Sequence, residues 1–326
     1  MKRRTAVLTL LFLTSTGLLF AQTGPHFFAT IDQSLAFEKR KQEDVFVFDY
    51  PLYVRTGLLF GEDYVHSVSF EYIDEPALGE TFVQGGFGAA AMKIGYFRED
   101  WSAGYAFSVV NELNIRDDRY PDTVFTQTER RPAPLFVFSI VQNGGVHQLA
   151  LSNREDVRSI DDTTIGLRTV ISTGIDLGFG MIRRIGSPPP LFFLTASREE
   201  DAYEVWTELG WRFVRNGDDN LNAVVGMLRH LAASDAAIEI IVSESRPLLF
   251  LEEKVFMGEG AWLDLGLFFH LFTFSTALDG SIGVSLNPRT EAELGTRLFF
   301  GKEGSFFSRS IGDNNNAVYL RFLFQF

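Results

Sequence analysis

The chain has 326 residues, of which 42 are acidic and 29 basic, so its net charge at pH 7 is −13. Such an acidic chain lacks the basic footprint that nucleic-acid binding requires. It contains no cysteine, which excludes disulfide-stapled domains and zinc sites of the thiolate type.

The first 21 residues have the layout of a secretory signal peptide. Lys2, Arg3 and Arg4 precede an apolar run from Ala6 to Ala21, and polar residues follow. This order predicts export and cleavage near Ala21. A retained membrane anchor is the alternative, although the run is short for a membrane span. The sequence thus divides into a signal peptide, 1–21, and one domain, 22–326.

The remaining chain alternates apolar and polar residues over long stretches, which are 27–37, 45–60, 101–115, 164–180 and 203–213. A period of two predicts half-buried antiparallel strands. These runs extend over 11 to 17 residues, whereas strands of soluble domains have about five or six. A tilted strand that crosses a bilayer needs about 9 to 11 residues.

The segments between the predicted strands fall into two length classes. Short turn motifs stand at 60–63, 97–100, 142–145, 215–220, 257–260 and 287–290. Longer polar connections are 38–44, 115–133, 153–162 and 301–316. Short turns and long loops mostly alternate along the chain. This alternation is typical of outer-membrane barrels, which have short turns on one side and long loops on the other.

Alternation alone does not distinguish a soluble sandwich from a membrane barrel, because the apolar face points inward in one and toward lipid in the other. The strand length and the many aromatic residues on the apolar face favour the barrel. The polar face then lines the lumen. Candidate pore-lining residues are Asp32, Asp49, Arg55, Lys93, Glu112, Arg168, Asp176, Glu204, Glu208, Arg212, Glu291, Glu293, Arg297 and Arg321.

The chain ends in an amphipathic run in which every second residue is apolar: Val318, Leu320, Phe322, Phe324 and Phe326. This ending resembles the C-terminal signature of bacterial outer-membrane β-barrel proteins. The resemblance implies that the last strand is recognised by the barrel assembly machinery. It also implies an outer-membrane location, with lipid around the barrel. It covers about ten residues closely and assigns no particular family.

The sequence therefore predicts an all-β fold, a single closed antiparallel transmembrane β-barrel. Bacterial single-chain barrels have an even number of strands, and the pattern indicates about 14, with 12 to 16 open. Two short runs, 188–194 and 246–256, are doubtful as strands because their apolar residues do not alternate cleanly.

A porin-like channel for small polar solutes or ions is the function that this pattern favours, and lumenal charges would set its selectivity. The loop 115–133 is the candidate constriction, with Asp117, Asp118, Arg119, Arg130 and Arg131. A plugged structural or surface-interaction barrel is the alternative. No cofactor or metal site is expected, and a homo-oligomer is left open.

A lipid-hydrolysing barrel enzyme is the third alternative, since such enzymes pair a histidine with a serine. His66 stands near Ser67 and Ser69, and His147 near Ser152. In each case the odd spacing places the two side chains on opposite faces of a strand. The sequence therefore predicts no catalytic residues.

Overall fold

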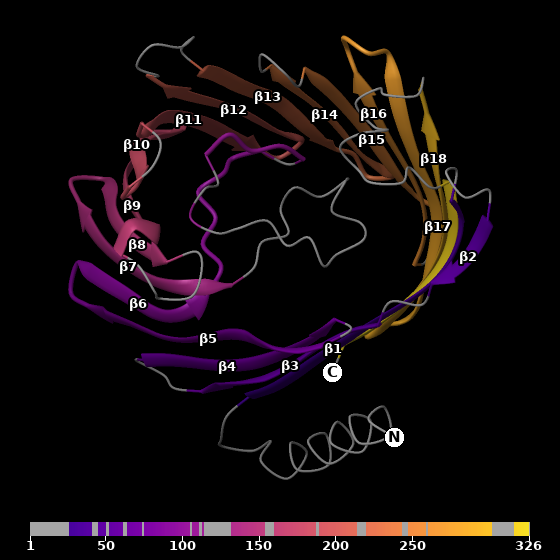
Figure 1. Cartoon of the computed structure of the whole chain (residues 1–326), viewed down its shortest axis with the longest axis horizontal. Coiled ribbons are helices and arrows are strands. Elements are labelled where there is room, and N and C mark those ends of the chain that lie inside the picture. The colour runs from indigo at the N-terminus through magenta and orange to yellow at the C-terminus, as the bar shows by residue number, and fades with distance from the viewer. Residues whose placement is uncertain are drawn as a thin grey trace.

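A computed structural model shows a closed β-barrel (Figure 1). The structure describes residues 26–40, 45–49, 52–60, 64–73, 75–104, 106–110, 113, 132–153, 160–186, 189–213, 220–242, 247–258, 260–301 and 316–325. No helix within these ranges is long and apolar enough to span a membrane.

One antiparallel sheet contains all the described strands. From β3 onward each strand pairs with the next along the chain, and β1 pairs with both β2 and β3. The strands are β1 (His26–Arg40), β2 (Val45–Asp49), β3 (Leu52–Phe60), β4 (Tyr64–Ile73), β5 (Glu75–Phe87), β6 (Ala90–Phe97), β7 (Ala133–Gln142), β8 (Gly145–Asn153), β9 (Thr163–Ser172), β10 (Asp176–Arg184), β11 (Leu191–Glu200), β12 (Tyr203–Arg212), β13 (Asn220–His230), β14 (Ser234–Val242), β15 (Leu248–Phe256), β16 (Ala261–His270), β17 (Ser275–Asn287), β18 (Thr290–Phe300) and β19 (Asn316–Gln325). A single 3-10 turn, Ile160–Asp162, precedes β9.

The barrel closes between its first and last strands. β19 pairs with β1 over ten residues, from Thr30 opposite Gln325 to Lys39 opposite Asn316. Within the described residues, closure gives each strand except the short β2 a neighbour on both sides, so the barrel wall has no long open edge of backbone N–H and C=O groups.

Eighteen strands surround the barrel, because β2 and β3 are two parts of one. Both pair with β1 in a single register, with Ala36 opposite Asp49 and Gln33 opposite Leu52. The sequence-based expectation of about 14 strands, within 12 to 16, is therefore wrong. The class of fold, a closed antiparallel barrel with an even number of strands, is as expected.

The two doubtful runs explain part of the miscount, since they form β11 and β15. The inward side chains of the first half of each strand are apolar and buried: Leu191 and Phe193 in β11, and Leu248 and Phe250 in β15. A strand whose lumenal face is covered by other protein atoms is apolar on both faces, so the alternation that reveals a half-buried strand is lost.

The covering element is the chain that follows β6, whose described residues from Arg98 to Leu113 lie inside the barrel (Figure 1). Residues 101–115 were expected to form a strand. The described part of this stretch, 101–104, 106–110 and 113, has no strand and lies against the lumenal wall. The expected short turn at 97–100 is likewise wrong, because the chain turns inward at Arg98 directly after β6. We call residues 98–113 the inner segment.

Large aromatic side chains of the lumenal wall lie flat over glycines on the neighbouring strand. Trp206 on β12 and Gly226 on β13 are register partners. A Cβ added to Gly226 would lie 2.4 Å from an atom of the Trp206 ring. Four further register pairs have a ring atom within 2.1 to 2.6 Å of such a Cβ: Phe28–Gly57, Phe193–Gly180, Trp262–Gly283 and Tyr319–Gly295. The glycines make room for the rings, as is known for aromatic–glycine pairs in sheets.

Gly226→Ala is expected to destabilise the barrel by about 1–3 kcal/mol, the usual cost of an added methylene in a packed interior. Gly86→Ala is the matched control, because a Cβ there meets nothing closer than 3.8 Å. Urea unfolding of the refolded protein in detergent measures both. Equal midpoints for the two variants would contradict this account of the ring–glycine contact.

Candidate functional site: the barrel lumen

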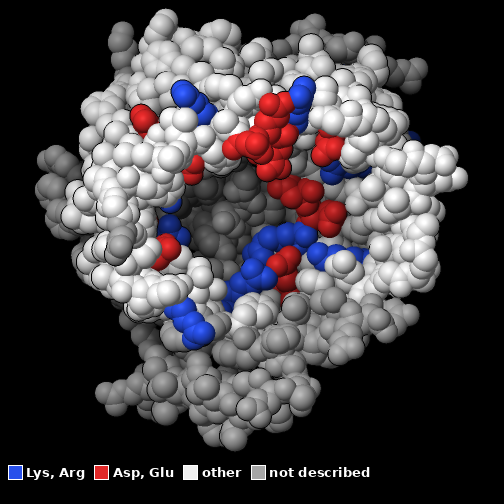
Figure 2. Space-filling model, turned by 180° about the vertical axis from the view of Figure 1, so that it is seen from behind, with Lys and Arg blue, Asp and Glu red and all other residues white. Residues whose placement is uncertain are grey.

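The barrel is hollow, and acidic and basic side chains line the visible opening (Figure 2). Acidic side chains gather on one part of the wall, and a row of basic side chains lies beside them. The inner segment covers another part of the wall.

Glu208, on β12, holds the first half of the inner segment. Its side chain is fully buried. One carboxylate oxygen, Oε1, accepts hydrogen bonds from the backbone N–H groups of Ala103 (2.5 Å) and Gly104 (2.9 Å) and from the Ser102 hydroxyl (2.7 Å). The other, Oε2, accepts from the N–H of Val109 (2.9 Å). A buried carboxylate with this many donors is well compensated for the loss of water.

Glu239, on β14, holds the middle of the inner segment in the same way. It is also fully buried, and it accepts hydrogen bonds from the N–H groups of Ala106 (2.7 Å) and Phe107 (2.9 Å). The two glutamates together satisfy five backbone N–H groups of a segment that has no helix or strand to satisfy them.

Apolar contacts complete the attachment of the inner segment. Phe107 packs in an edge-to-face arrangement against Phe250 and Phe268 on β15 and β16, with ring centroids 6.4 and 6.0 Å apart. Trp101 belongs to a second buried cluster with Phe193 on β11. The inner segment is thus a fixed part of the lumenal wall from β6 to β17.

Glu80, on β5, anchors the point at which the inner segment begins. Its Oε1 accepts a hydrogen bond from the N–H of Arg98 (3.0 Å), and its Oε2 lies 2.5 Å from the Arg55 guanidinium. Lys93 lies nearby between the rings of Phe82 and Phe97, 4.2 and 4.1 Å from their centroids. Burial raises the pKa of the adjacent Glu99 carboxyl, and the positive charge of Lys93 opposes that rise.

The wall formed by β15 to β19 carries a network of charged and aromatic side chains. Asp279 accepts two hydrogen bonds from Arg297, at 2.7 and 3.0 Å. The Tyr319 hydroxyl lies 3.1 Å from carboxylate oxygens of both Asp279 and Glu293. Arg321 stands 3.7 Å from Glu293. Asp279 is therefore paired with Arg297, and Glu293 lies beside Arg321, on this wall.

The candidate pore-lining residues whose side chains are described all lie on the inward face of their strands. They are Arg55, Lys93, Arg168, Asp176, Glu204, Glu208, Arg212, Glu291, Glu293, Arg297 and Arg321. Glu208 is buried beneath the inner segment, and Arg212 donates a hydrogen bond to the carbonyl of Pro189 at 2.7 Å.

The remaining candidates lie outside the described part of the structure. Asp32 and Asp49 fall in β1 and β2, but their side chains are not among those described. The same holds for the whole of Glu112, Asp117, Asp118, Arg119, Arg130, Arg131 and Phe326. Val318, Leu320, Phe322 and Phe324 occupy alternate positions of β19, on the face opposite Tyr319 and Arg321.

Sequence reasoning missed four residues that organise the lumen: Glu80, Glu239, Asp279 and Tyr319. Glu239 offered a signal, since it is the single charge within the apolar run Ala236–Val242 of strand β14. An isolated carboxylate in such a run indicates an inward position with a local partner. The partner itself, a backbone segment more than 130 residues away, has no sequence signal.

The histidine and serine candidates for catalysis are not brought together among the described side chains. Ser67 and Ser69 donate to the carbonyl of Glu80 at 3.3 and 2.9 Å. Ser152 donates to the carbonyl of Leu113 at 2.7 Å on the inner face, whereas His147 lies on the outer face. The side chain of His66 is not described. No group of three or more potential metal ligands occurs within the described residues.

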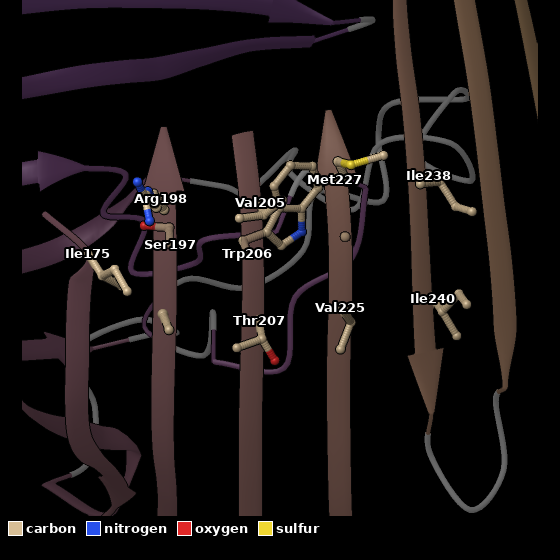
Figure 3. Close-up of a pocket in the computed structure, with 12 residues that line it drawn as sticks. Ile175, Ser197, Arg198, Val205, Trp206, Thr207, Val225, Met227, Ile238 and Ile240 are labelled. Atoms are coloured by element: carbon tan, nitrogen blue, oxygen red, sulfur yellow. The ribbon is translucent and has the colours of Figure 1, made fainter. Parts of the chain in front are cut away.

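The outer wall has two shallow apolar depressions. One, of about 540 Å³, lies over β10 to β14 and is lined mainly by Ile175, Ala196, Val205, Val225, Met227 and Ile240 (Figure 3). The other, of about 510 Å³, is lined by Phe179, Met181, Phe192 and Trp211 among others. Both face away from the lumen and are part of the apolar belt of the barrel.

Neither a protein-family model nor a curated protein matches this sequence. Solved structures of bacterial porins do match its fold. A variant of the porin of Rhodopseudomonas blastica superposes with a TM-score of 0.58 at 10% identity, covering 93% of this chain and 100% of that chain. A triple variant of the same porin gives 0.57 at 10% identity, with the same coverage.

A further structure, from work on the asymmetric conductivity of engineered proteins, gives a TM-score of 0.57 at 9% identity over 93% of this chain and all of that chain. The chain therefore has the porin fold. The resemblance to outer-membrane β-barrel proteins that the C-terminus suggested is confirmed at the level of the fold.

Proposed function

We propose that the protein is an outer-membrane channel for small polar solutes, narrowed by the inner segment. The carrying observation is that the described residues of the inner segment lie inside the barrel and are anchored there by Glu208 and Glu239. Because buried carboxylates fix the segment to one part of the wall, it narrows the lumen and does not close it. The charged walls on either side of it favour solutes that interact with both signs of charge.

The topology supports an orientation with both ends of the chain on the periplasmic side. Connections such as 88–89, 143–144, 201–202 and 288–289 have two residues each. They lie at the end of the barrel where β1 begins and β19 ends. Much longer connections, including 98–132 and 301–315, lie at the other end. In outer-membrane barrels the long loops are extracellular.

Export by the predicted signal peptide, with cleavage near Ala21, belongs to this proposal. So do insertion by the barrel assembly machinery through the C-terminal strand and lipid around the outer wall. Exposed apolar side chains on the outer face, such as Leu177, Phe179, Val225 and Leu265, support contact with lipid. A homo-oligomer stays a prediction.

Conductance measurements in planar lipid bilayers test the proposed channel function. Refolded protein should give discrete conductance steps, and their size should fall when polyethylene glycol small enough to enter is added. The alternative, a plugged barrel that acts through its outer loops, is supported by the amount of lumenal wall that the inner segment covers. A barrel that inserts into the bilayer but conducts no current in any salt would favour the plugged barrel over the channel.

A further inference from the structure

The larger outer depression, over β10 to β14, lies toward one end of the barrel wall. The strands around it begin or end at the short turns 173–175, 201–202 and 231–233. Figure 3 shows Arg198 near the end of β11, on the side of these turns. In the proposed orientation this end is periplasmic, so the depression faces the periplasmic leaflet of the membrane.

Two outward-facing rows of side chains, which run across the sheet, form the depression. The first row consists of register partners on β11 to β14: Arg198, Val205, Met227 and Ile238. The second row consists of Ala196, Thr207, Val225 and Ile240. Its side chains are small or β-branched, which leaves the wall hollow at this place.

The length of the depression fits an acyl chain. A diagonal from Arg198 to Ile240 crosses three strand spacings and two residue steps, which is about 16 Å in an ordinary sheet. One leaflet contributes about 15 Å to the hydrocarbon core of a bilayer. The depression is therefore long enough for the chain of a lipid that belongs to one leaflet.

A polar row borders the depression on the side of the turns. Glu200, Tyr203 and Arg229 are register partners on β11, β12 and β13. Arg198 forms an ion pair with Glu200, and the Tyr203 hydroxyl donates a hydrogen bond to Glu200 at 3.0 Å. Arg229 is exposed, and it forms no ion pair within the described residues. We call Arg198, Glu200, Tyr203 and Arg229 the polar rim.

The polar rim has two arginines and one carboxylate, so it carries an excess of positive charge on an otherwise acidic chain. Two strand spacings and two residue steps separate the Cα atoms of Arg198 and Arg229, which is about 12 Å. Arginine side chains are long and flexible enough to converge on one anion across this distance. Their planar guanidinium groups suit a phosphate.

We propose that the depression and the polar rim bind one phospholipid whose head group carries a phosphate and a primary ammonium. An acyl chain lies in the depression, where it removes apolar surface from contact with other lipids and fills the hollow. Arg198 and Arg229 bind the phosphate. Glu200 accepts a hydrogen bond from the ammonium, because its oxygens have lone pairs beyond those used by Arg198 and Tyr203. The proposal rests on the membrane placement in the proposed function and not on conductance.

Native mass spectrometry of the refolded, delipidated barrel in detergent tests this site. Phosphatidylethanolamine, phosphatidylglycerol and phosphatidylcholine with identical chains are the probes. The first phosphatidylethanolamine should bind more tightly than the second. Replacing Arg198 and Arg229 together by alanine should weaken the first binding step by on the order of tenfold or more, as expected for the loss of charge-assisted hydrogen bonds.

Arg183→Ala is the matched control for the arginines. Arg183 is exposed on the outward face of β10, at the opposite end of the wall and outside the depression. An arginine that only extends to the membrane surface behaves alike at both ends. Arg183→Ala should therefore leave the first binding step unchanged. Equal losses in Arg183→Ala and in the double variant overturn the site.

Two further substitutions test the head group and the chain separately. Glu200→Gln should reduce the preference for phosphatidylethanolamine over phosphatidylcholine, whose trimethylammonium group cannot donate a hydrogen bond. Ala196→Leu fills the depression and should weaken binding of all three lipids. Ala223→Leu adds the same volume on the same face, outside the depression, and should have no effect. Equal binding of phosphatidylethanolamine and phosphatidylcholine by wild type overturns the proposed head group.

A change of gel mobility on heating shows that each variant is folded before it is titrated. Multiples of the chain mass that vanish in Ala196→Leu would show that a second copy covers the depression, and this overturns the lipid site. A conducting barrel without a preferred first lipid also overturns it and leaves the channel intact. A silent barrel that binds the lipid as described disproves the channel alone.

Discussion

Replacing Glu208 and Glu239 together by leucine should release the inner segment from the wall and change the channel. The double variant leaves five backbone N–H groups without their acceptors. Each unsatisfied buried donor costs about 1–3 kcal/mol, so the segment should leave its buried position or the barrel should unfold at much lower urea. We expect a larger and noisier single-channel conductance in bilayers.

Glu204→Leu is the control for this experiment. Glu204 lies on the same strand and face as Glu208 but is only partly buried. Its loss should leave both the urea midpoint and the conductance close to wild type. The single variants Glu208→Gln and Glu239→Gln should have urea midpoints and conductances between those of wild type and the double leucine variant. The reason is that an amide retains one acceptor oxygen and the shape of the side chain. A double leucine variant with wild-type conductance would show that the apolar contacts alone fix the segment.

The strands were predictable because lipid outside and a polar lumen inside impose a period of two. The alternating run 164–180 predicted strand structure as a single stretch, and the fold divides it into β9 and β10 at residues 173–175. The number of strands was not predictable, because β11 and β15 pass under the inner segment and carry apolar residues on both faces. The number depends on a long-range contact that alternation does not encode.

The inner segment shows that an alternating sequence need not form a strand of the barrel. Residues 101–115 alternate in the sequence like a strand, and Trp101, Phe107 and Leu113 are indeed buried. Their burial comes from packing on the lumenal wall and not from lipid. The two environments select similar residues, so pattern alone cannot separate a membrane strand from an apolar segment folded into a barrel.

The charged residues of the lumen could be predicted as a class and not as a site. The alternation of polar and apolar positions correctly placed Glu208, Arg297 and Arg321 on the inward face of their strands. What each one does depends on strands that are adjacent only in the closed sheet. Glu208 binds backbone, whereas Arg297 pairs with Asp279 across β17 and β18.

Deleting residues 316–326 should abolish the folded barrel. β19 pairs with β18 on one side and with β1 on the other, so its loss leaves two open edges. In lipid an unpaired backbone group costs several kcal/mol, and ten register pairs with β1 alone are lost. Refolding into detergent or vesicles should give no species whose mobility on a gel changes with heating, in contrast to the wild-type barrel.

Deleting Phe326 alone distinguishes closure of the barrel from recognition of its last strand by the assembly machinery. A barrel without Phe326 keeps every pair of the described seam between β19 and β1, which runs from Asn316 to Gln325. We expect its urea midpoint to stay close to wild type, and its insertion by reconstituted assembly machinery to fall well below that of a Gln325→Ala control. Equal losses of stability and insertion would show that the terminal phenylalanine acts in the folded barrel and not as an assembly signal.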